Sequence, residues 1–537
     1  MSNSNVSETA LHSGESTTSE LAASGVLGVS FAAFLTAWAL LFQWVDHTTT
    51  VAGLSVLQLL GVALLAAAAG LVAIGVASRI EALDTTPSQT AGFAVGVVLG
   101  LLWSVLGAVL ATTLLGAGTL LWVPAALVFG AAGSLAGLLP REDIGSTVPV
   151  SLVLALLGGA IVLGQFDAGL TWEPSWTAAT FPGSELVPIV VIFGTLLAVW
   201  SGAKAKEGFG AQGREAGAFA LIGTVVFGML AVLALLIGFI VVNGLETMLT
   251  GAALAGGELT IPLVGVTIPW VSFPFLTNVT GGLFVEIPGV LPATLGTLWL
   301  VFGAVLFAVP LGVGAAVFLT EYAERGRFTQ VVEVATNGLW STPSIVFGLF
   351  GLAFLVPRIS GGNSIIVGQL VLGFMLLPLV LITSREAILA VPDEYRDASA
   401  ALGVTKWQTI RSVVVPAAMP GTITGVILGV GRIAGETAPL LLVFGGAPYP
   451  SNTPNVLGSF QLTPNPPFIT NEALLSPASA LPYQLYSTIT AGVFPKDIFT
   501  NQEFGWGTAL VLLLVVIALY TIGVGSRLYF RRKLHHE

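Results

Sequence analysis

Cysteine is absent from this chain of 537 residues, and histidine occurs only four times, twice at the C-terminal end. Without cysteine the chain has no disulfides and no thiolate-bound metal, and four scattered histidines do not favour a metal site. We also find no cluster of His, Asp or Ser with catalytic spacing. The composition therefore argues against redox chemistry and against an enzyme.

Charge is scarce as well, because Asp, Glu, Lys and Arg make up 9% of the residues while 55% are hydrophobic. A chain with a mean hydropathy of +0.93 has too little polar surface for a water-soluble globule. Its apolar runs are near the length of a membrane span, and they are continuous rather than alternating like barrel strands. We therefore expect an all-α, polytopic membrane protein.

Twelve segments are apolar and long enough to be spans: 24–45, 51–78, 91–115, 118–138, 148–166, 186–202, 216–242, 291–319, 343–357, 364–383, 420–444 and 507–526. Lys and Arg close to span ends favour the cytoplasmic side, which places the basic C-terminal cluster of Arg527, Arg531, Arg532 and Lys533 inside. An even number of spans then predicts that both termini are cytoplasmic in the cell membrane.

The polar residues divide the chain into four parts. Residues 1–20 contain no Lys or Arg, so we interpret them as a disordered cytoplasmic tail rather than a signal peptide. Residues 21–202 form an extension of about six spans whose role the residues do not indicate. A polar break then predicts a cytoplasmic linker at 203–215 and a second six-span domain at 216–533. We detect no repeat that relates the two halves.

Two long loops on the outer side are rich in Pro, Gly and aromatic residues, at about 243–290 and 445–505. The first contains Asn278, Val279 and Thr280, which match a glycosylation acceptor. The second contains LPYQLY at 481–486, which we expect to form a short amphipathic segment at the outer face.

The cytoplasmic loop at about 385–420 is the most charged region between spans. Pro392 and the acids that follow it are typical of a helix start, and this helix should end near Leu402. Gly403 is expected to adopt the left-handed conformation, and Thr405 to cap a second helix that Pro416 interrupts. One face of the first helix carries a docking surface of small residues and their neighbours: Tyr395, Ala398, Ser399 and Leu402. The acids of this helix argue against binding to anionic lipid.

Residues 421–444 form a predicted span that contains Arg432 and Glu436 four residues apart, hence on one face. A charge in mid-membrane costs about 2.5–3.5 kcal/mol, so such residues usually face a bundle interior or a polar path. We predict a substrate path at Arg432, Glu436 and Thr437. The alternative is a neutralised ion pair that only locks helices together. Pro439 is expected to end or kink the helix.

The charged loop resembles the EAA loop of ABC importer permeases, through Asp397-Ala398-Ser399, Gly403 and the apolar residues before Pro416. This resemblance implies that the loop forms coupling helices that fit into a cleft of a cytoplasmic ATPase. The residues that it assigns to coupling are Asp397, Ala398, Ser399, Gly403, Trp407 and Pro416.

GRIAGETAPLL at 431–441 and STPSIVFGLFGL at 341–352 resemble the PstA-type permeases of phosphate ABC importers, and the similarity extends over about 216–533. It implies a permease subunit that imports inorganic phosphate with a PstC-type permease, a PstB-type ATPase and a PstS-type phosphate-binding protein. This chain has no P-loop, so ATP and Mg would be bound by the ATPase partner, and the chain itself would hold no cofactor or metal. Lipid is the other expected partner, and nucleic acid is not expected.

Two other functions remain open at this point. The same type of permease serves other oxyanions, such as sulfate or molybdate. A secondary transporter driven by an ion gradient fits the span count, but it predicts related halves and several intramembrane acids.

Overall fold

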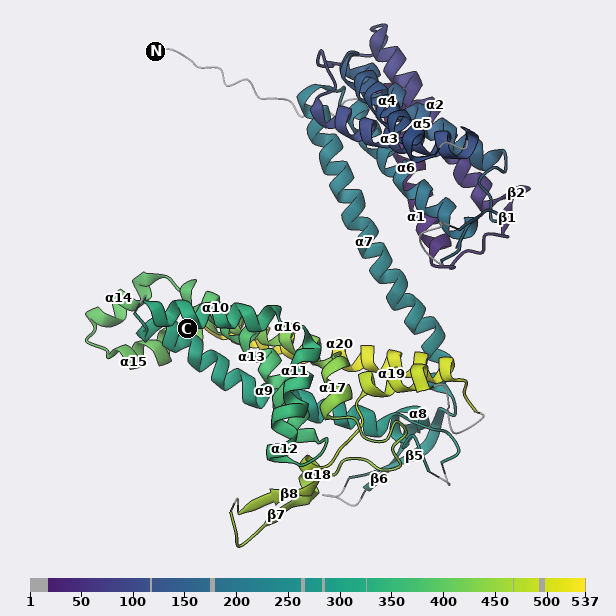
Figure 1. Ribbon diagram of the computed structural model, residues 1–537. Helices are drawn as coiled ribbons and strands as arrows, with labels where there is room; N and C mark the ends of the chain where they lie inside the picture. Colours follow the sequence, from purple (N-terminus) through teal and green to yellow (C-terminus); the bar gives the residue numbers. More distant parts are fainter. Residues whose placement is uncertain are drawn as a thin grey trace. The chain divides into compact units, whose positions relative to one another are not determined.

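Figure 1 shows the protein as a computed structural model, in which the described residues are 18–115, 118–173, 179–261, 266–282, 285–324, 326–466, 468–491 and 498–536. The chain forms two compact units, Met1–Ile237 and Gly238–Glu537, and the boundary falls within the long helix α7 (Gly210–Leu249). Each unit is described by itself.

The first unit consists of helices joined by short loops. Before α7, its helices are α1 (Thr18–Leu41), α2 (Val56–Arg79), α3 (Phe93–Leu115), α4 (Thr119–Leu138), α5 (Glu142–Val162) and α6 (Gly183–Lys206). Two small antiparallel hairpins lie in its loops, β1 (Thr50–Val51) with β2 (Leu54–Ser55) and β3 (Thr171–Trp172) with β4 (Phe181–Pro182). A capping box between Ser55 and Gln58 fixes the start of α2 directly after the first hairpin.

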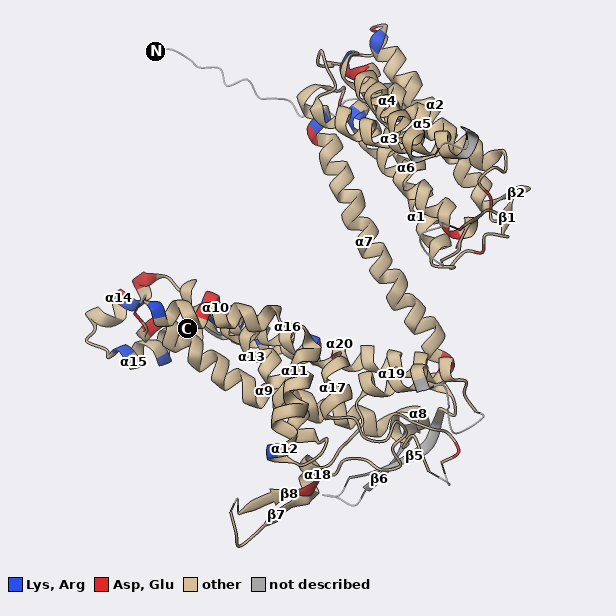
Figure 2. Ribbon diagram, in the orientation of Figure 1, with Lys and Arg blue, Asp and Glu red and all other residues tan. Residues whose placement is uncertain are grey.

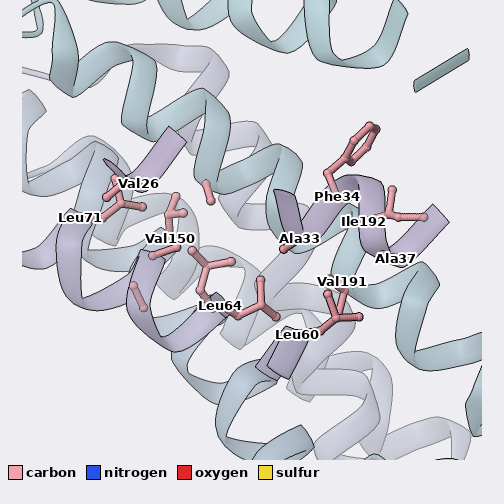
Figure 3. Packing of buried hydrophobic residues seen from close by; sticks show 14 of the residues in the cluster. Val26, Ala33, Phe34, Ala37, Leu60, Leu64, Leu71, Val150, Val191 and Ile192 are labelled. Carbon is pink, nitrogen blue, oxygen red and sulfur yellow. The ribbon is translucent and has the colours of Figure 1, made fainter. Parts of the chain in front are cut away.

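The core of the first unit lies between α1, α2, α5 and α6 (Figure 3). Leu60, Leu64 and Leu71 are spaced four and seven residues apart on α2, so they share one face, and Val150 of α5 and Val191 of α6 are buried in the same cluster. Helices α3 and α4 pack as a close hairpin through small residues. A Cβ on Gly100, for example, would lie 2.2 Å from the Ser134 Oγ, so only glycine permits this approach.

The second unit is built around α13. Its helices and π-helical turns (η1 to η3) are α8 (Pro274–Thr277), α9 (Leu291–Val317), η1 (Phe318–Tyr322), α10 (Arg327–Ser341), α11 (Ser344–Phe350), η2 (Gly351–Leu355), α12 (Val356–Ile359), α13 (Ile365–Leu389), α14 (Asp393–Ala401), α15 (Lys406–Thr409), η3 (Ile410–Val414), α16 (Val415–Ala434), α17 (Ala438–Val443), α18 (Glu472–Leu475), α19 (Leu481–Ala491) and α20 (Asn501–His536). Helix α13 packs against both α9 and α16. Leu300, Val371, Leu372 and Leu376 are buried where α9 meets α13.

The loops of the second unit contain two antiparallel hairpins and a short 3-10 turn, η4 (Leu457–Ser459). The hairpins are β5 (Ala253–Ile261) with β6 (Val266–Ser272) and β7 (Phe460–Leu462) with β8 (Ile469–Asn471). The predicted segment at 481–486 is the start of helix α19. Asn278 and Thr280 are tied into the fold, because the Asn278 amide donates to the Ile287 carbonyl at 2.9 Å and the Thr280 side chain is fully buried.

The predicted membrane spans are confirmed as helices, with shifted ends. Among the described residues, eleven helices are long and apolar enough to cross a membrane. The twelfth candidate is a pair, Arg327–Ser341 and Ser344–Ile359, bent by 103°. Thr342 and Pro343 separate the two helices, because the residue before a proline avoids helical geometry. The predicted span at 343–357 is therefore one arm of a bent pair.

Most of the predicted tail, residues 1–17, lies outside the described residues, and Thr18 begins α1. The segment at 203–215, which the sequence predicts as a cytoplasmic linker, comprises the end of α6, a turn and the start of α7. This segment is also packed into the first unit, because Lys204 and Phe209 are both buried.

Candidate functional site

The cytoplasmic loop predicted at 385–420 folds as two helices around a glycine. Helix α14 begins directly after Pro392 and ends at Ala401. Gly403 follows with a φ of +73°, the left-handed region that glycine adopts without steric cost. Thr405 then caps α15 in a capping box with Gln408. The predicted helix, glycine turn and helix are confirmed.

The predicted coupling residues are not all on the surface. Asp397, Ala398 and Trp407 are exposed, and the Trp407 side chain is 58% accessible. Ser399 is buried at 8%, so it faces the body of the protein and does not belong to the predicted docking surface. Helix α14 packs against α15 and the π-helical turn η3.

Pro416 does not interrupt the second helix of the loop. The residues from Lys406 to Ala434 form one continuous helical segment, in which the π-helical turn η3 precedes Pro416 in the first turn of α16. A π-helical turn shifts the hydrogen-bond pattern by one residue, so the missing N–H of the proline is accommodated. The loop at about 385–420 and the charged span are therefore joined by continuous helix.

Four residues that the sequence did not single out anchor this loop: Glu321, Tyr322, Arg396 and Lys406. Glu321 in η1 accepts hydrogen bonds from the Arg396 guanidinium at 2.9 and 3.2 Å. The Lys406 ammonium donates to the backbone carbonyl of Glu321 and lies 5.0 Å from the centre of the Tyr322 ring. Figure 2 shows that charged residues gather at this end of the second unit, around α14 and α15. The signal in the sequence was the first acid after a long apolar run, at the start of the charged stretch 321–327.

Arg432 and Glu436 lie close together, but not on one unbroken helix. Helix α16 ends at Ala434, and α17 begins at Ala438 with Pro439 in its first turn. The helix therefore ends near the charges and ahead of Pro439, as expected, with Glu436 and Thr437 in the break. The Arg432 Nε is 3.6 Å from the Glu436 Oε1. The Arg432 side chain is 38% accessible and that of Glu436 is 17% accessible, so the pair is partly exposed at the surface of the unit.

The two sequence stretches that carry the resemblance meet at this break. The Arg432 guanidinium lies over the Trp340 ring, 4.6 Å from its centre, at the end of α10. Helix α11 packs directly on α17, where a Cβ on Gly348 would lie 2.7 Å from the Pro439 Cα. The arginine is thus held between a carboxylate and an aromatic face, at the junction of two broken helices. Such a site presents one directed positive charge within an apolar body.

An apolar cavity of about 880 Å³ lies between α9, α16 and α20. Val305, Val309, Thr422 and Val426 are among its lining residues, and it contains no charged side chain. No group of three or more potential metal ligands occurs within the described residues.

The first unit contains a buried ion cluster that sequence reasoning missed. Glu142 is fully buried and accepts hydrogen bonds from the backbone N–H groups of Ser88 and Gly210, each at 3.0 Å. The Lys204 Nζ is 3.3 Å from its Oε1, and an Arg214 nitrogen is 3.1 Å from its Oε2. The cluster ties the start of α5 to the end of α6 and the start of α7. These residues looked like ordinary loop charges, because nothing local indicates that they are buried.

Comparison with known proteins adds the family. A family model described as binding-protein-dependent transport system inner membrane component matches residues 308–536, all within the second unit. The probable ABC transporter permease protein YqgI of Bacillus subtilis is 32% identical over 289 residues, which cover 53% of this chain and 93% of that protein.

Two PstA proteins are similarly related. The phosphate transport system permease protein PstA of Haemophilus influenzae is 30% identical, covering 49% of this chain and 87% of that protein. The probable PstA of Methanocaldococcus jannaschii is also 30% identical, with 52% and 90% covered. The fold and these matches define a multi-pass membrane permease subunit rather than an enzyme. The chain belongs to the binding-protein-dependent transport system inner membrane component family, and within it to the PstA-type permeases.

Proposed function

We propose that this chain is a transmembrane subunit of an ATP-driven importer of inorganic phosphate in the cell membrane. The observation that carries the proposal is the position of Arg432, which lies between Glu436 and Trp340 where α16 breaks. The PstA names of the relatives support phosphate as the substrate. The stretch at 431–441 contains Arg432 and Glu436, and the stretch at 341–352 directly follows Trp340 and packs through Gly348 against Pro439.

Arg432 offers a positive charge to an oxyanion that crosses the apolar helices. In a medium of low dielectric constant this attraction is much stronger than in water. Glu436 holds the guanidinium in place between passages, or accepts a hydrogen bond from a protonated phosphate oxygen, which sulfate cannot donate. Thr437 lies beside Glu436 in the break and offers a hydroxyl group to the same path.

The partners follow from this assignment. A PstC-type permease completes the membrane path, and a PstS-type protein delivers phosphate from outside. A PstB-type ATPase binds ATP and Mg and grips α14 and α15 through Asp397, Ala398 and Trp407, whereas this chain binds no cofactor. This arrangement places the loop and both termini in the cytoplasm.

The test is to isolate the assembly through this subunit from phosphate-starved cells, and then to measure uptake in vesicles of radioactive phosphate, sulfate and molybdate. We expect an ATPase among the co-purifying proteins and uptake of phosphate alone. Arg432→Ala should abolish phosphate uptake with the assembly intact. Arg358→Ala is the matched control, because that guanidinium also lies over an aromatic ring, Phe354, at 4.0 Å. Uptake of sulfate or molybdate instead, no ATPase, or normal uptake by Arg432→Ala would each refute the proposal.

A further inference from the structure

The two coupling helices are attached to the end of α9 by a set of contacts that we call the Glu321 clamp: Glu321, Arg396 and Lys406. Two nitrogens of Arg396 converge on one carboxylate oxygen of Glu321. The Glu321 side chain is 10% accessible and that of Arg396 24%, so the pair is largely shielded from water. Charge-assisted hydrogen bonds in such a setting are stronger than exposed ones.

The same arginine also holds the end of α13. Its guanidinium donates to the carbonyl of Val391 at 2.8 Å and to that of Ile388 at 3.1 Å. A third bond, to Asp393 at 3.1 Å, involves a side chain that is 91% accessible and contributes little. Arg396 therefore joins α14, the end of α13 and the end of α9 at one point. Lys406 connects the start of α15 to the same turn, because its ammonium donates to the Glu321 carbonyl of η1.

Other contacts hold the ends of the loop rather than its middle. The residues from Ala400 to Gln408 are all exposed, including Leu402 at 83%. On either side of them Ser399, Thr409 and Ile410 are buried, and Val414 is buried in an apolar cluster with Ala316 near the end of α9. Within α14 it is Arg396 that bonds to η1, so a force applied to α14 would reach the end of α9 through Glu321 as well as through this cluster.

Helix α9 is well placed to transmit that force. It runs for 27 residues, packs along α13, and lines the apolar cavity with Val305 and Val309. Pro310 lies inside α9 and removes one backbone hydrogen bond, so α9 can bend there, and the segment between Pro310 and η1 moves with Glu321. Pro310 and Val313 of this segment also line the cavity. Motion of its η1 end would therefore change the walls between α9, α16 and α20.

We infer that Glu321 is a positioning residue that couples ATP-driven movement of α14 to α9, and that the clamp makes these two elements move together. This inference rests on the proposed function for the ATPase that moves α14 and for the substrate used to measure uptake. The clamp is distinct from the surface that binds the ATPase, since Glu321 and the guanidinium of Arg396 face the helical body.

The test uses the purified complex with Glu321→Arg, Arg396→Glu and the double exchange. Each single variant should keep the ATPase bound at the parent level but lower phosphate uptake about tenfold, the scale set by loss of a charge-assisted hydrogen bond. The double exchange restores opposite charges but not the hydrogen bonds from Arg396 to the carbonyls of Val391 and Ile388, so it should recover part of the uptake. Glu324→Arg is the matched control, because it makes the same charge change on an exposed side chain three residues away.

A second readout does not depend on the substrate. Because the chain has no cysteine, spin labels can be placed on introduced cysteines at Ala400 in α14 and Gly314 in α9, where a Cβ meets no atom within 4 Å. In the parent complex the distance between the labels should stay constant when ATP is trapped by vanadate, and in Glu321→Arg it should change.

The outcomes separate the two proposals. One outcome is that the parent complex takes up no phosphate, while its label distance stays constant and that of Glu321→Arg changes. This outcome would refute the proposed substrate and support the clamp. Glu321→Arg with normal uptake and a constant label distance would refute the clamp, and so would a double exchange that recovers nothing. Loss of the ATPase from Glu321→Arg would also refute it, because Glu321 would then serve docking.

Discussion

Replacing Glu142 by glutamine is expected to destabilise the first unit by about 3–5 kcal/mol, the cost of leaving a buried charge without its partner. Lys204 is 1% accessible, and without Glu142 its ammonium would keep the Ser146 hydroxyl at 2.9 Å but no opposite charge nearby. The glutamine NH₂ group would also face a cluster made of donors, because Glu142 receives two backbone N–H groups, Lys204 and Arg214.

Replacing the other partner, Lys204, should destabilise the first unit less. In Lys204→Met the carboxylate of Glu142 still has Arg214 at 3.1 Å and both backbone N–H groups. The stability lost in Lys204→Met is then close to the contribution of one charged hydrogen bond, about 1.5–3 kcal/mol. The double variant Glu142→Gln, Lys204→Met removes both charges, so it should be more stable than the sum of the two single effects predicts, by about 1–3 kcal/mol.

Hydrogen exchange of the purified protein, followed by mass spectrometry, measures the local stability around Glu142 in peptides from α5 and α6. Glu185→Gln is the matched control, since Glu185 is exposed in the first turn of α6. Equal protection in Glu142→Gln and in the parent would refute the reasoning. Strictly additive effects in the double variant would show that Glu142 and Lys204 do not interact.

Three further predictions concern the second unit. Gly403→Val forces a branched residue to a φ of +73°, at a cost of about 1–2 kcal/mol, and should reduce co-purification of the ATPase; unchanged co-purification would contradict the role of the turn. Trp340→Ala removes a cation–π contact of about 0.5–2 kcal/mol and should lower phosphate uptake, whereas Trp340→Phe should retain most of it; equal uptake by both would argue against the contact with Arg432. Asn278 should carry no glycan, because its amide is bonded within the fold, so the masses of the parent protein and of Asn278→Gln should differ only by the substitution itself. A glycan on Asn278 in the parent would disprove this.

The positions of the spans were predictable because an apolar run of sufficient length has to be shielded from water whatever its neighbours are. The turn at Gly403 was predictable for a similar reason, since capping and glycine preferences depend on a few adjacent residues. Rules that depend only on neighbouring residues were less successful at predicting where a helix continues and where it breaks. The sequence favoured interruption at Pro416, but a π-helical turn carries the helix through it.

Contacts between distant residues were outside the reach of sequence reasoning. Glu321 and Arg396 are separated by 75 positions, and neither has a local pattern that indicates the other. The burial of Glu142 depends on the ends of α5, α6 and α7 meeting, and the same residue would be an ordinary solvated acid in an open loop.

The sequence by itself determined the class of the protein, the approximate spans and the helix–glycine–helix loop, and it predicted a site at Arg432. Each of these depends on hydropathy, on charge in an apolar segment, or on backbone preferences, which act over a few neighbouring residues. Only the tertiary structure decided that Trp340 lies over Arg432, that Ser399 faces inward, and that Glu321 links the loop to α9. The physical reason is that these features are made by packing between helices far apart in the chain, and packing is decided by all the partners together.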